Sequence, residues 1–119
     1  MPLYGSGLNV RDWLHVDDHC QGIHLALTKG KAGEIYNIGG GIELNNLELT
    51  NQILEIMGKS QESIDYVEDR KGHDFRYSVD TTKISNELGY TPKVDWETGL
   101  KETLNWYLEN EAWWRPLKK

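Results

Sequence analysis

The chain has 119 residues and a formal net charge of −6, which fits one acidic domain. It has no clustered Lys and Arg of the kind that mark a nucleic-acid surface, and no apolar run approaches the roughly 18 residues that span a bilayer. The single cysteine, Cys20, excludes an internal disulfide, and the first residues show no signal-peptide pattern. We therefore expect a cytoplasmic protein that binds neither nucleic acid nor membrane.

The first forty residues predict a turn, a strand, a helix and a second strand. Proline and glycine indicate a turn over residues 1–7. Residues 10–16 carry strand-forming side chains, and residues 17–30 follow with the apolar spacing of a helix. Residues 33–38, GEIYNI, are apolar enough to form a strand inside a sheet rather than at a wet edge.

The rest of the chain predicts three more helices. Residues 45–58 have the best-formed helical pattern, and residues 63–69 are expected to form a strand. A charged loop over 67–77 leads into further helices at 81–89 and 96–114. Because strands alternate with helices, the sequence predicts an α/β or α+β class; we take the α/β fold, with few short strands and about four helices.

Each predicted helix begins at a side chain that can accept hydrogen bonds from free backbone amides. Asn45 and Glu48 have the spacing of a reciprocal capping box. The other predicted caps are Asp17 or Asp18, Asp80, and Asp95. Gly30 is placed to end the first helix.

Four stretches together resemble one family of nucleotide-sugar enzymes. They are YGSGLNVRDWLHVDDHCQGI (4–23), GEIYNIGGGIELNNLELT (33–50), DRKGHDFRYSVDTTKISNELGY (69–90) and WETGLKETLNWYLEN (96–110), followed by a Trp-Trp pair. In order and over essentially the whole chain, they are similar to the C-terminal part of the dTDP-glucose 4,6-dehydratases. That family belongs to the extended short-chain dehydrogenase/reductase (SDR) group.

The resemblance implies the substrate-binding part of a Rossmann-type, NAD-dependent lyase. Such an enzyme converts dTDP-glucose to dTDP-4-keto-6-deoxyglucose in rhamnose-type deoxysugar synthesis for polysaccharide, and it is a homodimer. Residues 1–119 would be one C-terminal fragment, with about 12–41 packed on the missing Rossmann domain and about 42–119 forming the substrate domain proper. Without that partner, we expect the fragment to self-associate, to swap segments, or to leave residues 1–40 poorly ordered.

The catalytic residues and the NAD site would lie upstream of this chain. No Gly-x-Gly-x-x-Gly opens a helix after a strand, and no tyrosine is followed by lysine four positions later. We therefore expect the fragment to be inactive and to bind no cofactor. His15, His19 and Cys20 do not form a closed ligand set, so we expect no metal site either.

The same resemblance assigns the substrate-binding residues. They are Pro2, Leu3 and Tyr4 along the base, Arg11 at the diphosphate, Asn46 at the start of a helix, and Asp69, Arg70, Gly72 and His73 closing over the nucleotide. A guanidinium group suits phosphate because it offers parallel donors to two oxygens. The family has proline where this chain has Lys71, which removes a fixed φ from the loop.

Each assignment has a structural alternative. Arg11 could instead pair with Asp12 or Asp17, and Asn46 could itself be the helix cap. The first residues could fray, and the charged loop could simply be solvated surface. At the level of function, the alternatives are a related epimerase or dehydratase that uses another nucleotide, or a non-catalytic module that binds nucleotide sugars.

Overall fold

A computed structural model describes residues 1–118 of the chain. Its α-helices are α1 (Val16–Lys29), α2 (Asn46–Ile56), α3 (Thr82–Leu88), α4 (Trp96–Glu109) and α5 (Glu111–Trp114). Its strands are β1 (Pro2–Tyr4), β2 (Val10–Trp13), β3 (Ile42–Asn45) and β4 (Asp65–Val67). Single 3₁₀ turns lie at Gln61–Ser63 and Arg115–Leu117. The predicted α/β class with few short strands is confirmed.

The strands form two separate two-stranded sheets. β1 pairs in parallel with β4, and β2 pairs antiparallel with β3, so that Asp12 lies opposite Glu43. Neither β1, which lies in the predicted turn over residues 1–7, nor β3 was predicted from the sequence. These strands have three and four residues, too few to show the alternation that identifies a strand in a sequence.

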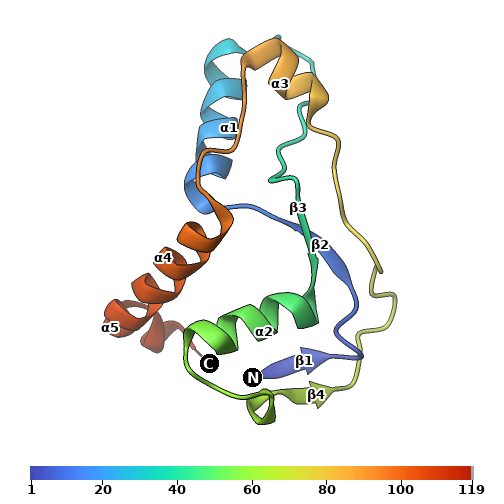
Figure 1. Cartoon of the computed structure of the whole chain (residues 1–119). Helices are drawn as coiled ribbons and strands as arrows, with labels where there is room; N and C mark the ends of the chain where they lie inside the picture. Colours follow the sequence, from blue (N-terminus) through green and yellow to red (C-terminus); the bar gives the residue numbers. More distant parts are fainter. Residues whose placement is uncertain (119) are drawn as a thin grey trace.

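The strand predicted at residues 33–38 is wrong. The segment runs alongside α1 and α3 (Figure 1), and within the described residues it has no strand partner. Side chains hold it instead: Lys83 Nζ donates to Glu34 Oε2 at 2.6 Å, and the Tyr36 hydroxyl donates to Glu87 Oε2 at 3.0 Å. A strand requires a hydrogen-bonded neighbour, so apolar composition alone did not produce one here.

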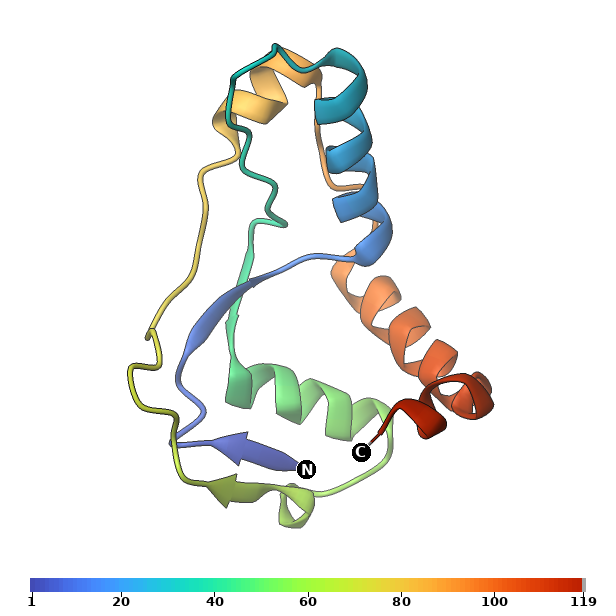
Figure 2. The same ribbon diagram turned by 180° about the vertical axis from the view of Figure 1, so that it is seen from behind.

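The main hydrophobic core lies where α1 and α3 meet, at one end of the molecule (Figure 1). Ile84, Leu88 and Tyr90 are buried there, and the Tyr90 hydroxyl donates to the Gly39 carbonyl at 3.0 Å. Both views place β1, β4 and α2 at the opposite end, with α4 and α5 along one side (Figure 2). Leu54 of α2 is also buried.

The predicted caps of α2 and α4 are confirmed, and the predicted cap of α1 is wrong. Asn45 Oδ1 accepts from the Glu48 amide at 2.8 Å, Glu48 Oε2 accepts from the Asn45 amide at 2.8 Å, and Asp95 accepts from the Thr98 amide at 3.1 Å. Helix α1 is capped by His15, whose Nδ1 accepts from the Asp17 amide at 3.3 Å.

Asp18 has a different task. Its side chain is buried, and its two oxygens accept from the Lys93 and Val94 amides at 2.9 and 3.0 Å. Since a buried carboxylate must be hydrogen-bonded to avoid a large desolvation cost, this contact ties the start of α1 to the turn before α4. A sequence pattern cannot distinguish this long-range role from a local cap.

The remaining helix ends differ in detail from expectation. Gly30 ends α1 as predicted, but its φ of −65° makes no use of glycine's left-handed freedom. Asp80 accepts from the Thr82 amide at 2.8 Å, although Thr81 occupies the cap position of α3. The helix predicted over 96–114 is interrupted at Asn110, which separates α4 from α5.

Among residues 1–118, no helix is long and apolar enough to cross a bilayer. Within the same residues, no group of three or more His, Cys, Asp or Glu side chains is arranged to hold a metal ion.

Candidate functional site

Polar and aromatic side chains from three segments converge beside the start of β2. We call them the arginine cluster: Tyr4, Arg11, Asp69, Arg70, His73, Asp74 and Tyr77. Tyr4 comes from β1 and Arg11 from β2, and the others belong to the charged loop after β4. The cluster contains five of the residues that the resemblance assigns to substrate.

His73 is the centre of the cluster. Its Nε2 lies 2.8 Å from Arg11 Nη2 and 2.8 Å from Arg70 Nη2, and its Nδ1 lies 2.6 Å from Asp69 Oδ1. A guanidinium group can only donate, so Nε2 must be the acceptor and the ring proton must sit on Nδ1. The neutral imidazole, with a side chain only 5% exposed, therefore holds two cations at a single acceptor atom.

Other groups fix the direction of each guanidinium. Arg11 donates to the Val10 carbonyl at 2.6 Å and to the Asp74 carbonyl at 3.0 Å, and its guanidinium carbon lies 4.4 Å from the centre of the Tyr77 ring. Arg70 lies 5.3 Å from the centre of the Tyr4 ring. Stacking on an aromatic face is favourable for arginine, and within residues 1–118 neither guanidinium pairs with a carboxylate.

The structure does not pair Arg11 with Asp12 or Asp17. Asp12 Oδ1 instead accepts from the Gly40 amide at 3.0 Å, and Asp17 lies beside His15. The sequence-based alternative, an ion pair within the chain, therefore does not describe Arg11.

The loop that carries Arg70 and His73 turns tightly. The His73 amide donates to the Arg70 carbonyl at 3.2 Å, and Gly72 has a φ of +70°. A positive φ at the third residue is typical of a type II turn, whose second residue is often proline. Lys71 occupies that second position, which explains physically why proline fits the family pattern there.

Charges within the loop shift two ionisation equilibria. The hydrogen bond from His73, aided by the Arg70 backbone amide, lowers the pKa of Asp69 below its ordinary value. The hydrogen bond from Tyr77 to Asp74 raises the pKa of the Tyr77 phenol. Both effects keep the groups in the states that the hydrogen-bond network requires, with Asp69 ionised and Tyr77 protonated.

Four residues that the resemblance assigns to substrate lie outside the arginine cluster: Pro2, Leu3, Asn46 and Gly72. Asn46 is half-buried as the first residue of α2, and its amide donates to the Asn9 carbonyl at 3.1 Å. Because Asn45 is the cap, the alternative role of Asn46 as the cap is wrong. Leu3 is buried and Pro2 is exposed, and both are paired with β4 rather than frayed.

Three further residues, which the sequence did not indicate, support the site. Asn9 is buried, and its Nδ2 donates to the Asp74 carbonyl at 3.2 Å. Asp74 and Tyr77 belong to the charged loop over 67–77, but nothing in their spacing indicates contact with Arg11. These contacts join residues more than sixty positions apart, so no local pattern could reveal them.

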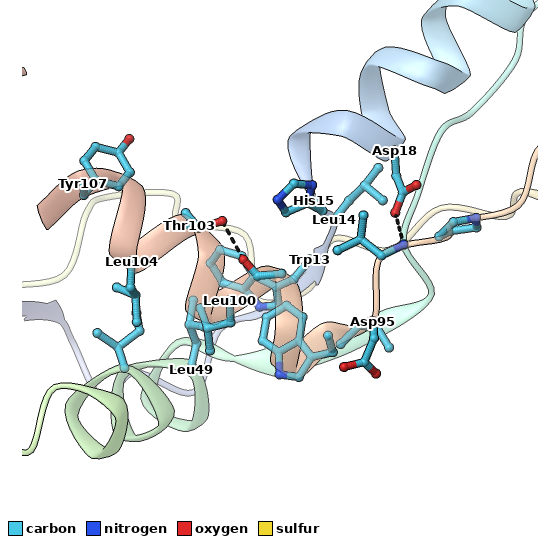
Figure 3. Close-up of a pocket in the computed structure, with 17 residues that line it drawn as sticks. Trp13, Leu14, His15, Asp18, Leu49, Asp95, Leu100, Thr103, Leu104 and Tyr107 are labelled. Carbon is cyan, nitrogen blue, oxygen red and sulfur yellow. Dashed lines mark hydrogen bonds between the residues drawn. The ribbon is translucent and has the colours of Figure 1, made fainter. Parts of the chain in front are cut away.

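A hollow of about 250 Å³ adjoins the cluster. Its lining residues are Arg11, Asp12, Ile38, Tyr77, Ser78 and Val79. A separate apolar groove of about 320 Å³ lies between α2, α4 and β2, where Figure 3 shows Leu49, Leu100 and Leu104. The groove offers few polar groups, whereas the arginine cluster presents converging cationic donors. The cluster is therefore the better site for an anionic ligand.

Comparison with known proteins gives a consistent result. The family described as GDP-mannose 4,6 dehydratase matches residues 1–103. The dTDP-glucose 4,6-dehydratase of Streptomyces niveus is 58% identical over 118 residues, which cover 99% of this chain and 35% of that protein. The chain thus spans about a third of the length of the curated relatives that it matches.

Solved structures agree with the sequence comparison. DesIV, a dTDP-glucose 4,6-dehydratase from Streptomyces venezuelae solved with NAD and TYD bound, superposes with a TM-score of 0.96 at 58% identity, over 99% of this chain and 37% of that one. The UDP-glucose 4-epimerase of Thermotoga maritima, solved with UDP-glucose, gives 0.85 at 35% identity, over 93% and 35%.

Proposed function

Since this chain belongs to the GDP-mannose 4,6 dehydratase family, we propose that it is the C-terminal, substrate-binding part of a dTDP-glucose 4,6-dehydratase. The parent enzyme would be an NAD-dependent lyase and a homodimer that converts dTDP-glucose to dTDP-4-keto-6-deoxyglucose for rhamnose-type deoxysugar synthesis. Its substrate is a nucleoside diphosphate sugar, which presents an aromatic base, a ribose, two charged phosphates and a hexose.

The observation that carries the proposal is the convergence of Arg11 and Arg70 on one acceptor atom, His73 Nε2, at 2.8 Å each. A diphosphate offers several acceptor oxygens to the same donors, and it carries the negative charge that the neutral imidazole lacks. Each charge-assisted hydrogen bond of this kind contributes about 1.5 to 3 kcal/mol. On binding, Arg11 and Arg70 would therefore leave the nitrogen that they share and donate to separate phosphate oxygens, which are stronger acceptors.

The other assigned residues suit the remaining parts of the ligand. The Tyr4 ring can stack on the base, and Asp69 can accept from a sugar hydroxyl if His73 is drawn toward phosphate. Asn46 is the first residue of α2, where the helix dipole favours an anion. The backbone at Pro2 and Leu3 would lie along the base, and Gly72 would allow the backbone to approach the nucleotide closely. These roles follow the family resemblance and remain proposals.

The residues of this chain do not fit an NAD site. Dinucleotide binding needs a glycine-rich turn between a strand and a helix. Within the described residues, the YGSG turn instead joins β1 to β2, and the glycines at 39–41 lead into β3. We therefore assign NAD and the reacting groups to another part of the parent enzyme, and we expect no turnover by the 119-residue chain alone.

Nucleotide competition tests the proposal. Isothermal titration of the chain with thymidine diphosphate, UDP and GDP should give the tightest binding for thymidine diphosphate. A clear preference for UDP would instead support a relative of the epimerase type, to which the chain is 35% identical in one solved case. Incubation with dTDP-glucose and NAD should yield no product, and measurable product would contradict the assignment of the chemistry elsewhere.

A further inference from the structure

A second charged group lies behind the arginine cluster. Arg76 Nε and Nη2 donate to Glu43 Oε2 and Oε1 at 2.8 and 2.7 Å, and the Ser78 hydroxyl donates to Glu43 Oε1 at 2.7 Å. The two oxygens of Glu43 thus accept three hydrogen bonds. We call Glu43, Arg76 and Ser78 the Glu43 clamp. None of these residues belongs to the arginine cluster.

The Glu43 clamp joins two segments that lie on either side of β2. Within segment 74–78, residues 75–77 run parallel to β2 at a single bridge between Val10 and Arg76: the Val10 amide donates to the Phe75 carbonyl at 2.8 Å and the Tyr77 amide donates to the Val10 carbonyl at 3.1 Å. Glu43 lies on β3, on the other side of β2. The clamp therefore bridges the two segments that flank β2 and fixes the distance between them.

Glu43 and Arg76 lie on the face of β2 opposite to the face that carries Arg11 and Tyr77. Side chains alternate between faces along a strand, so Arg76 and Ser78 share one face while Tyr77 points to the other. Glu43 is opposite Asp12 in the pairing, which places it on the face away from Arg11. The contact of Arg11 with the Tyr77 ring at 4.4 Å agrees with this arrangement.

We propose that Glu43 and Arg76 are positioning residues, which hold segment 74–78 against β2 so that Tyr77 and the Asp74 carbonyl orient Arg11 toward its anionic ligand. The consequence for ligand binding rests on the proposed function, whereas the consequence for the Arg11 side chain does not. A planar bidentate pair is suited to this task because it fixes direction as well as distance. As a source of stability alone, an ion pair this exposed contributes little.

A matched ion pair supplies the control. Glu43→Gln removes one carboxylate from the clamp, and Glu34→Gln removes the carboxylate that accepts from Lys83 at 2.6 Å beside α3. The exposed fractions of the two glutamate side chains are 37% and 48%, so the two substitutions are comparable. Arg76→Lys is a third variant, which keeps the charge but loses the two-pronged geometry.

The first readout is the nuclear Overhauser effect between the Arg11 δ-protons and the Tyr77 ring in the ligand-free chain. We expect it in the wild type and in Glu34→Gln, and we expect it to be lost in Glu43→Gln and in Arg76→Lys. Its retention in Glu43→Gln would overturn the proposal whatever the chain does with nucleotides.

The second readout is the calorimetric affinity for thymidine diphosphate. Glu43→Gln should weaken it about tenfold, and Glu34→Gln should leave it unchanged. In an Arg11→Ala background, Glu43→Gln should cause no further loss, because the clamp acts through Arg11; a second tenfold loss would contradict positioning. If the wild-type chain binds no thymidine diphosphate, the proposed function fails, while the Overhauser comparison still decides the role of the clamp.

Discussion

Arg11 and His73 are 62 residues apart in the chain, and their side chains meet at 2.8 Å. The imidazole is neutral at this contact because its Nε2 must accept from the guanidinium. Arg70 reaches the same atom, so the site holds two positive charges with one neutral acceptor between them. The arrangement is poised for a ligand that brings its own negative charge.

Acid should weaken the His73 contact through Asp69. The pKa of Asp69 is lowered in the folded chain from an ordinary value of 3.8, so its contribution to stability is present above about pH 4 and is lost as pH falls through the folded-state pKa. Urea unfolding at pH 6 should show the wild type to be more stable than Asp69→Asn, and the difference should shrink toward pH 3. A difference that grows in acid would contradict the assigned hydrogen bonds.

Lys71→Pro should stabilise the loop. Lys71 occupies the second position of the turn from Arg70 to His73, a position that favours proline, whose fixed φ also restricts the unfolded chain. We expect a gain of about 0.4 to 1 kcal/mol in the free energy of unfolding. Gly72→Ala should lose about 1 kcal/mol, because its φ is +70° although no atom lies within 4 Å of the added carbon. A loss of stability with Lys71→Pro would argue against this turn.

Asp18 should be far more important to stability than its neighbour. Asp18→Ala leaves two amide groups without their acceptor in a part-buried region, and we expect a loss of about 3 kcal/mol in the free energy of unfolding. Asp17, whose side chain is 82% exposed, is the matched control, and Asp17→Ala should change stability by less than about 0.5 kcal/mol. Equal effects of the two substitutions would show that Asp18 is only a local helix residue.

The exposed apolar side chains of α1 and the following segment should promote self-association. Leu27 is 83% exposed and Ile35 is 80% exposed, and exposed apolar surface of this kind favours contact with another chain. Sedimentation velocity should reveal dimers or larger species at tens of micromolar, on the order that weak contacts require. The double substitution Leu27→Glu and Ile35→Glu should shift the population toward monomer. A wild-type chain that remains monomeric would contradict this expectation.

The sequence predicted well what depends on neighbouring residues. The capping box of Asn45 and Glu48 and the apolar spacing of α2 are local features, and both appear as expected. Prediction from the sequence failed where a structure depends on residues that are distant along the chain. Residues 33–38 have the composition of a strand but no strand beside them, and Asp18 caps the turn before α4 rather than its own helix. Within the site, the family resemblance rather than any pattern linked Arg11 to Arg70, while Asn9, Asp74 and Tyr77 became visible only in three dimensions.

The most direct test of the account is the affinity of thymidine diphosphate for the chain with both cluster arginines removed. Each arginine contributes at least one charge-assisted contact of about 1.5 kcal/mol or more, so Arg11→Ala combined with Arg70→Ala should weaken binding by about 100-fold or more. Arg115→Ala, at an exposed i, i+4 pair with Glu111, is the control and should bind like the wild type. An unchanged dissociation constant in the double variant would contradict the claim that these guanidinium groups hold the diphosphate.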